Sequence, residues 1–202
     1  MKPLFILLIS LSSSLFSAGQ QLRNSNFETW VDSVGQLFPD GWTADQRASI
    51  WLSPSTNVRQ GTYSLVLSTW YSYVEGHLFY GIHQKPFGKN WKDYAVPFAS
   101  RPLKLSGFYR YIDLVNPTDS AMGELLIKDM AGDTVAYGNI FFKGTENWKK
   151  FEIPLTYHPG REPASIAIHF VSNVHSAGLK EDNSYPNRLY LDHFKLLYKE
   201  KD

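Results

Sequence analysis

The sequence predicts an all-β domain, a jelly-roll β-sandwich of two antiparallel sheets. Apolar and polar residues alternate with period two in many short segments, which is the pattern of half-buried strands. Turn-forming residues recur between these segments, and no stretch keeps the 3.6-residue apolar period of an amphipathic helix. About eight or nine short strands separated by turns are typical of a sandwich, and a jelly roll also brings the first and last strands together.

The alternation is clearest in segment 63–68, where Tyr63, Leu65 and Leu67 share one face. Further strands are expected near residues 77–83, 103–111, 121–129, 133–142, 150–155, 166–171 and 188–198. A turn at 130–133 joins two of them into a hairpin. The irregular stretches 84–101 and 172–187 are rich in Gly, Pro, Asn and Ser, so they are expected to be loops over one end or face.

Residues 1–19 have the features of a secretory signal peptide. Lys2 supplies the charge, residues 4–11 form an apolar run, and Ser17-Ala18-Gly19 supplies small residues for cleavage before Gln20. The apolar run is shorter than the ~20 residues that span a bilayer. Residues 20–202 are then expected to be one exported domain, periplasmic, outer-surface or secreted, with no membrane insertion after cleavage. The chain has no cysteine, which excludes disulfides and a lipoprotein anchor.

Charge and aromatic content limit the classes of partner that the sequence indicates. The 20 basic and 19 acidic residues nearly balance, so the clustered positive charge that nucleic acid or an anionic membrane surface requires is not indicated. Aromatic residues make up 15% of the chain, which is enough for a β-rich core and also for a binding surface.

Several motifs occur in a fixed order along the chain. They are Asn26-Phe27-Glu28-Thr29-Trp30, Pro39-Asp40-Gly41-Trp42, Gly61-Thr62-Tyr63-Ser64-Leu65, Arg101-Pro102-Leu103-Lys104-Leu105-Ser106-Gly107-Phe108-Tyr109-Arg110-Tyr111, Phe151-Glu152-Ile153-Pro154-Leu155-Thr156-Tyr157 and Leu191-Asp192. In order and spacing they resemble the "putative carbohydrate metabolism domain" of secreted and outer-surface proteins of glycan-using Gram-negative bacteria. That domain is itself similar to jelly-roll, galactose-binding-like carbohydrate-binding modules. The resemblance covers nearly all of residues 24–198.

The resemblance also implies a metal site. Related jelly-roll modules commonly bind a structural calcium ion between the Phe-Glu segment and an Asp of the last strand. The matching positions are Glu28 and Asp192, helped by backbone carbonyls near residues 61–64. Calcium takes six to eight oxygen ligands, many of them backbone carbonyls. Alternatively, Glu28 is solvated or hydrogen-bonds a turn, and Asp192 caps a strand end.

A sugar site needs an aromatic platform for the apolar face of a pyranose and polar groups for its hydroxyls. The candidates are aromatic residues in predicted loops or on one strand, together with polar neighbours: Trp70, Tyr71, Tyr73, His77, Trp91, Tyr109, Arg110 and Tyr111. The alternative for each is ordinary packing, because most Trp and Tyr residues of a sandwich are buried or half-buried. Trp30, Trp42 and Trp148 are expected to belong to the core.

The function that these observations favour is that of an exported, non-catalytic carbohydrate-binding module for an oligosaccharide or polysaccharide. The alternatives are a surface protein-interaction domain, and a glycan-active lyase or hydrolase on the same fold. The sequence contains no HExxH motif, no Gly-x-Ser-x-Gly elbow and no phosphate-binding loop. Whether the chain is an enzyme is left open by the sequence.

Overall fold

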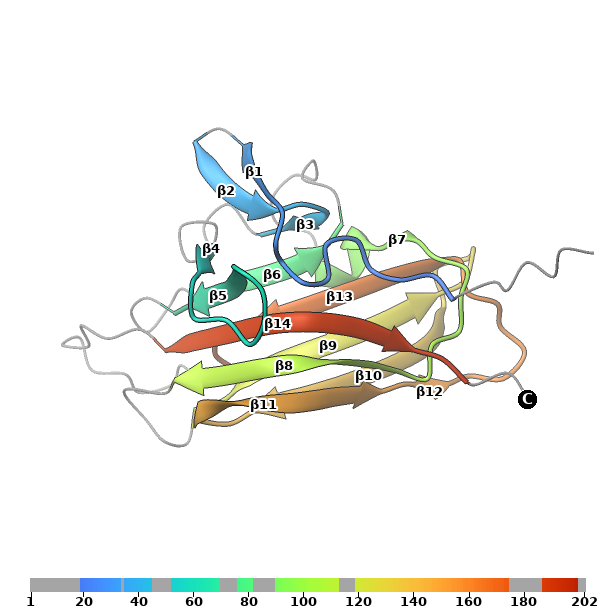
Figure 1. The fold of residues 1–202 in the computed structure, drawn as a ribbon. Coiled ribbons are helices and arrows are strands. Elements are labelled where there is room, and N and C mark those ends of the chain that lie inside the picture. The colour runs from blue at the N-terminus through green and yellow to red at the C-terminus, as the bar shows by residue number, and fades with distance from the viewer. Residues whose placement is uncertain are drawn as a thin grey trace, which may run out of the picture.

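A computed structural model describes residues 19–33, 35–44, 52–69, 76–81, 90–112, 119–174 and 187–199. These residues form strands and one described 3-10 helix (Figure 1). In chain order the elements are β1 (Trp30–Ser33), β2 (Gln36–Pro39), β3 (Trp42–Thr43), β4 (Leu52–Ser55), β5 (Ser64–Ser68), β6 (His77–Tyr80), η3 (Trp91–Tyr94), β7 (Val96–Pro97), β8 (Lys104–Ile112), β9 (Ala121–Lys128), β10 (Thr134–Phe142), β11 (Thr145–Pro154), β12 (Thr156–Tyr157), β13 (Ser165–Val171) and β14 (Arg188–Leu197).

The strands form two sheets that face each other. The front sheet, toward the viewer in Figure 1, has the order β11-β8-β14-β5-β4. The back sheet has the order β12-β10-β9-β13-β6-β3, and β7 also pairs with β13. The short hairpin β1-β2 stands apart. All of these pairings are antiparallel, so the predicted jelly-roll sandwich of two antiparallel sheets is confirmed.

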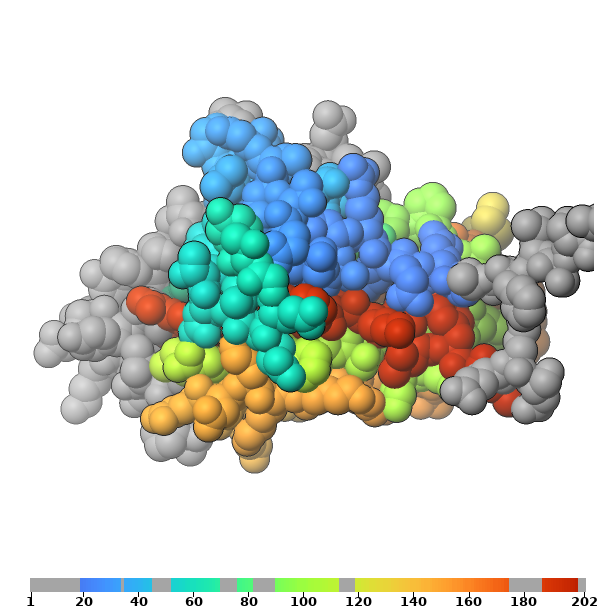
Figure 2. All heavy atoms as spheres, viewed as in Figure 1, coloured from blue at the N-terminus to red at the C-terminus, as the bar shows by residue number. Residues whose placement is uncertain are grey.

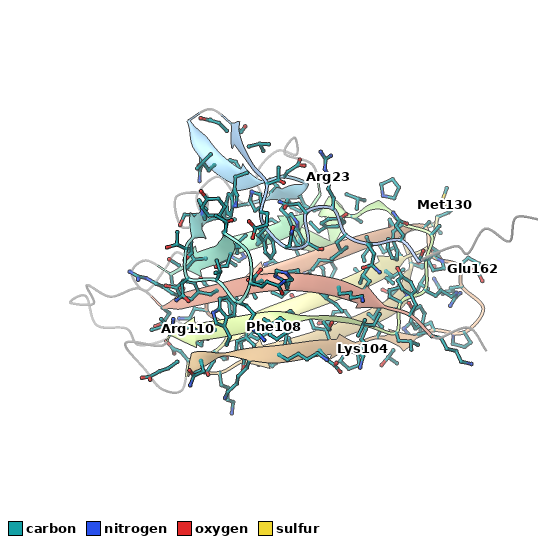
Figure 3. All side chains as sticks on the ribbon, in the orientation of Figure 1. Arg23, Lys104, Phe108, Arg110, Met130 and Glu162 are labelled. Carbon is teal, nitrogen blue, oxygen red and sulfur yellow. The ribbon has the colours of Figure 1, made fainter. Side chains whose placement is uncertain are left out.

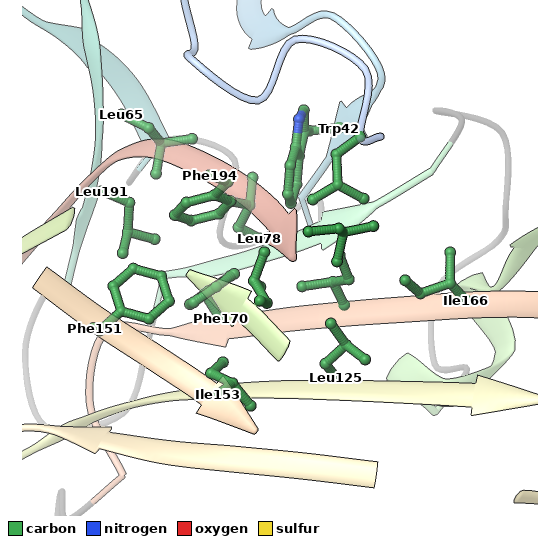
Figure 4. Close-up of a cluster of buried hydrophobic side chains, with 14 of the residues drawn as sticks. Trp42, Leu65, Leu78, Leu125, Phe151, Ile153, Ile166, Phe170, Leu191 and Phe194 are labelled. Atoms are coloured by element: carbon green, nitrogen blue, oxygen red, sulfur yellow. The ribbon is translucent and has the colours of Figure 1, made fainter. Parts of the chain in front are cut away.

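The core lies between the sheets because alternate residues of each strand point inward. Leu125 of β9, Ile168 and Phe170 of β13, and Leu105 and Leu191 of the front sheet are all at most 1% exposed. Figure 4 shows side chains of both sheets meeting in this layer. Each strand therefore has one apolar inner face and one outer face, and on the back sheet part of that outer face is also covered, since Phe79, Leu126 and His169 are at most 6% exposed.

The N-terminal segment lies along the last strand. The backbone N–H of Phe194 donates to the carbonyl of Ser25 (2.7 Å). Further along, the N–H of Leu196 donates to Oε1 of Gln21 (3.1 Å), and Nε2 of Gln21 donates to the carbonyl of Leu196 (2.9 Å). The expected meeting of the two ends of the domain is confirmed.

Most predicted strands are found close to their expected positions. The hairpin β9-β10 turns at Asp129, whose carboxylate accepts the N–H groups of Ala131 and Asp133. The stretch 84–101 was expected to be irregular, but its described part contains η3 and β7, which packs on β13. Residues 1–18 of the predicted leader lie outside the described residues. In the ranges that the structure describes, no helix is both long enough and apolar enough to cross a membrane.

Candidate functional site

A line of side chains crosses the outer face of the back sheet. Asn139 of β10 is paired with Glu124 of β9, Glu124 with His169 of β13, and His169 with Phe79 of β6. Residues that lie opposite each other in neighbouring strands point to the same face. These four side chains therefore stand side by side across four strands, on the face away from the core.

Hydrogen bonds join this line into a continuous chain. Asn139 Nδ2 donates to the hydroxyl of Tyr137 (3.1 Å), and that hydroxyl donates to Oε1 of Glu124 (2.7 Å). Oε2 of Glu124 lies 3.2 Å from Nδ1 of His169, and Nε2 of His169 lies 2.9 Å from Nδ1 of His77. Because an ionised carboxylate only accepts, His169 carries its hydrogen on Nδ1, and its Nε2 accepts from Nδ1–H of His77.

Burial sets the charge state of this polar chain. The side chains of His169 and Glu124 are only 8% and 13% exposed. Burial lowers the pKa of His169 below its usual 6.5, although the hydrogen bond to Glu124 opposes this shift. Burial raises the pKa of Glu124, but the hydrogen bonds from His169 and Tyr137 outweigh it, so this pKa lies below the usual 4.5. At neutral pH an ionised glutamate therefore stands beside a neutral histidine.

The helix η3 supplies an aromatic border to this face. The ring of Trp91 stacks on His169, with centroids 5.5 Å apart and planes at 24°. Tyr94 stacks on Phe79 at 4.6 Å, and Phe79 in turn lies 4.9 Å from His169. The side chain of Asn90 caps the first turn of the helix. Trp91 is half-exposed, so it keeps surface for another ring.

Phe141 adds a second aromatic surface. It lies on β10 two residues beyond Asn139, hence on the same face, and it is 53% exposed. Its partner across the strand pair is Met122, which is half-buried. The polar chain thus has aromatic rings beside it at two places, one from η3 and one from β10.

Two of the predicted sugar-binding residues meet at this face. His77 and Trp91 both contact His169, through a hydrogen bond and a ring stack respectively. The predicted residues Trp70, Tyr71 and Tyr73 lie outside the described residues, so their role stays a prediction.

The predicted residues of β8 lie on the other sheet. Tyr111 is fully buried, and Tyr109 packs inward with its ring 4.7 Å from Phe142. Arg110 points outward from the front sheet, with Cζ 5.9 Å from the ring centroid of Tyr190. Because successive residues of a strand face opposite ways, these three do not form one site and do not join the polar chain of the back sheet.

The three tryptophans that were expected in the core do not all lie there. Trp42 is fully buried and Trp30 packs against the core, as predicted. For Trp148 the expectation is wrong, because its ring meets Tyr190 edge-on at 6.5 Å on the outer face of the front sheet. The register of β11 shifts between Thr145 and Lys149, and this irregularity is not visible in the alternation of the sequence.

Glu28 and Asp192 bind the same loop, residues 59–63. Both oxygens of Glu28 accept from the backbone N–H groups of Thr62 and Tyr63 at 2.9–3.3 Å. Oδ2 of Asp192 accepts from the N–H groups of Arg59 (3.0 Å) and Gln60 (3.3 Å). The two carboxylates therefore fasten the loop over the outer face of the front sheet, where Figure 2 shows it covering part of β14.

Glycine is required at the centre of this loop. Gly61 has φ +85°, and a Cβ there would lie 2.1 Å from Oε1 of Glu28. The carboxylate of Glu28 therefore lies directly against the loop backbone at Gly61.

The donor set around these carboxylates fits calcium only in part. Glu28 and Asp192 supply anionic oxygens, which calcium prefers. However, the groups that the structure turns toward them are backbone N–H donors rather than carbonyls, and Oδ1 of Asp192 lies 2.8 Å from Nδ1 of His193. The described residues contain no group of three or more His, Cys, Asp or Glu residues that could hold a metal ion. A calcium ion at this position stays a prediction.

Comparison with known proteins identifies the fold. No protein-family profile and no curated protein sequence matches the chain. A putative glycoside hydrolase from Bacteroides thetaiotaomicron aligns over 88% of this chain and 71% of its own, with a TM-score of 0.61 and 16% identity. One from Bacteroides vulgatus aligns over 86% and 97%, with a TM-score of 0.59 and 17% identity. A family 16 carbohydrate-binding module aligns over 87% and 98%, with a TM-score of 0.52 and 14% identity.

The chain has the jelly-roll fold of these proteins. At such identities the likeness concerns the fold alone, and it agrees with the fold that the motifs imply.

Sequence reasoning missed most of the jelly roll's polar chain. Nothing in the sequence indicates that Glu124 and His169 lie side by side in one site. Tyr137, Asn139 and Phe141 were not singled out. The available signal was that each stands at an outward position of a predicted strand, but the register that lines them up comes from the sheet.

Proposed function

We propose that the outer face of the back sheet binds an uncharged oligosaccharide or polysaccharide, and that the protein acts as an exported, non-catalytic binding module. The supporting observation is the ordered chain Asn139-Tyr137-Glu124-His169-His77 bordered by the rings of Trp91 and Phe141. Fixed donors and acceptors suit sugar hydroxyls, and half-exposed rings suit the apolar face of a pyranose.

The charge of the face favours a neutral ligand. Glu124 is ionised at neutral pH, and His169 beside it is neutral. A uronic acid or sulfated sugar placed beside Glu124 would meet a like charge, which disfavours binding there, whereas the cation nearest the border, Lys92, lies over the Trp91 ring with Nζ 5.8 Å from its centroid. A neutral sugar can donate a hydroxyl hydrogen to the carboxylate without this penalty.

Binding is favoured over hydrolysis by the number of acids. Glycosidases that use two carboxylates need a pair roughly 5–10 Å apart. Among the residues that the structure describes, Glu124 is the one acid of the polar chain, and both of its oxygens already accept hydrogen bonds from Tyr137 and His169. Such an acid orders its neighbours rather than serving as a free proton donor.

Affinity electrophoresis in gels that contain neutral polysaccharides tests the proposal. A panel of β-glucans, xylan, mannan and galactan should retard the parent protein on at least one member. Trp91→Ala should bind about tenfold more weakly or worse, because covering an aromatic ring contributes about 1.5–3 kcal/mol. Trp148→Ala, on the other sheet, is the matched control and should migrate like the parent. Unretarded migration of the parent on every gel, or equal binding by Trp91→Ala, overturns the proposal.

A further inference from the structure

A second cluster lies on the outer face of the front sheet. Arg110 of β8 and Tyr190 of β14 are register partners, and the guanidinium lies over the Tyr190 ring. Trp148 of β11 meets the same ring from the side. We call these three residues the Arg110 cluster. Figure 3 shows Arg110 and Phe108 together along β8, on the side of the molecule that faces the viewer.

Two donors of the Arg110 cluster lack hydrogen-bond partners. Nε of Arg110 and Nε1 of Trp148 are buried, and within the part of the chain that the structure describes neither has an acceptor. A buried donor without an acceptor is costly, and native structures keep few of them. An acceptor from outside the chain can reach these two buried nitrogens only after the two side chains turn.

The surrounding face is basic. Its outward positions and the loop 59–63 carry Arg59, Lys104, Arg110, Lys150, Arg188 and Lys195. Three acids here already have partners: Glu152 pairs with two lysines, and Asp192 and Glu28 accept backbone N–H groups of the loop, while Glu146 of β11 is a further, exposed acid. The chain as a whole has a formal net charge of only +1, so the excess on this face is local.

The arginines of this face are the charges left uncompensated. In the described ranges, Arg59, Arg110 and Arg188 have no carboxylate partner. Arg59 lies over the ring of Phe108 at 5.0 Å, and Arg110 lies over Tyr190. A guanidinium that rests on an aromatic ring keeps its N–H edge for a planar anion.

We propose that the Arg110 cluster binds a carboxylate of an acidic glycan, a polysaccharide built from uronic acid residues. The Nε–H and an Nη–H of a guanidinium form a fork that matches the two oxygens of a carboxylate. The indole N–H of Trp148 supplies a further donor, and the rings of Trp148 and Tyr190 supply apolar surface for the sugar. This site is separate from the neutral-glycan face, lies on the opposite sheet and has the opposite charge, so either site can exist without the other.

Affinity electrophoresis in polygalacturonate, with a chelator present to remove calcium bridges, tests this site. The parent should be retarded, and the retardation should fade as sodium chloride is raised. Fully methyl-esterified polygalacturonate, which keeps the sugar but loses the charge, should retard it far less. Arg110→Gln should weaken binding about tenfold or more, because a hydrogen bond to a charged group is lost. Arg110→Lys, which keeps the charge without the fork, should fall between the two.

Matched controls separate this site from general attraction of charge. Arg23→Gln changes the net charge equally at an exposed position far from the cluster, and it should bind like the parent (Figure 3). Trp91→Ala should also bind polygalacturonate normally. Circular dichroism confirms that each variant is folded. Equal loss in Arg110→Gln and Arg23→Gln, absence of binding by the parent, or retention by polyglutamate but not by polygalacturonate overturns the proposal; the last result would assign the cluster to an acidic polypeptide.

Discussion

Glu124→Gln is the sharpest test of the polar chain on the back sheet, because it keeps the shape and removes the charge. The carboxylate accepts from Tyr137 at 2.7 Å and from His169 at 3.2 Å. Glutamine has one carbonyl for two donors. If the carbonyl faces Tyr137, the amide N–H groups meet Nδ1–H of His169. If it faces His169, the amide meets the Tyr137 hydroxyl, which already accepts from Asn139.

The expected loss of folding stability follows from this mismatch between donors and acceptors. Hydrogen bonds to a charged group contribute about 1.5–3 kcal/mol each, and Glu124 is mostly buried, so losing one and weakening the other should destabilise the fold by about 2–3 kcal/mol. For a domain of this size the expected fall in Tm is about 4–12 °C. The difference in stability between the parent and Glu124→Gln should become smaller at acidic pH. The pKa of Glu124 lies below 4.5 in the folded state, so its stabilising contribution is present above pH 4.5 and disappears as pH falls through the folded-state value.

Thermal melting followed by circular dichroism measures both effects. Glu152→Gln is the matched control, since Glu152 also accepts two side-chain hydrogen bonds but at a half-exposed position between Lys104 and Lys150. Its Tm should change little. A Tm for Glu124→Gln within about 1 °C of the parent at pH 7 would refute the view that the side chains of the polar chain are ordered by this carboxylate.

Three other outcomes are expected. Stability should decline as pH drops below 6.5, since the unfolded state takes up a proton on His169 before the folded state does; a flat stability curve between pH 7 and 5 would contradict this. Calcium should raise Tm relative to a chelator, and Glu28→Gln should remove the rise; identical melting in both buffers would show that no ion binds there. Gly123→Ala places a Cβ 2.6 Å from the ring of Phe170, so urea denaturation should show a loss of about 1–3 kcal/mol, whereas an unchanged midpoint would mean that the ring moves freely.

The fold could be predicted because its signals are local. Alternation of Leu65 and Leu67, or of Ile166 and Ile168, depends only on the strand itself and survives in any sheet. Phe27 belongs to the first of the ordered motifs, and its ring packs in the core 5.0 Å from Phe194. Such features fix which face of a strand turns inward.

The site could be predicted only in part because it depends on register. His77 and Trp91 were identified by residue type, but Glu124 and His169 join them only when β6, β13 and β9 align. A shift of one residue in any of these pairs would turn the polar side chain inward. The same limit applies to Arg110, whose contact with Tyr190 is set by the pairing of β8 with β14.

The position of β14 has a consequence for how the chain reaches its native state. This last strand lies between β8 and β5, so β5 and β4 join the front sheet only through it. The carboxylate of Asp192 accepts the backbone N–H of Arg59, which lies 133 residues earlier in the sequence. During synthesis, the edges of β5 and β8 must therefore wait unpaired until the C-terminal strand emerges, and closure of the sandwich is a late, slow, long-range step. A chain in which β14 has not yet been made offers two open strand edges to its neighbours, so chaperone protection should matter most before this strand emerges.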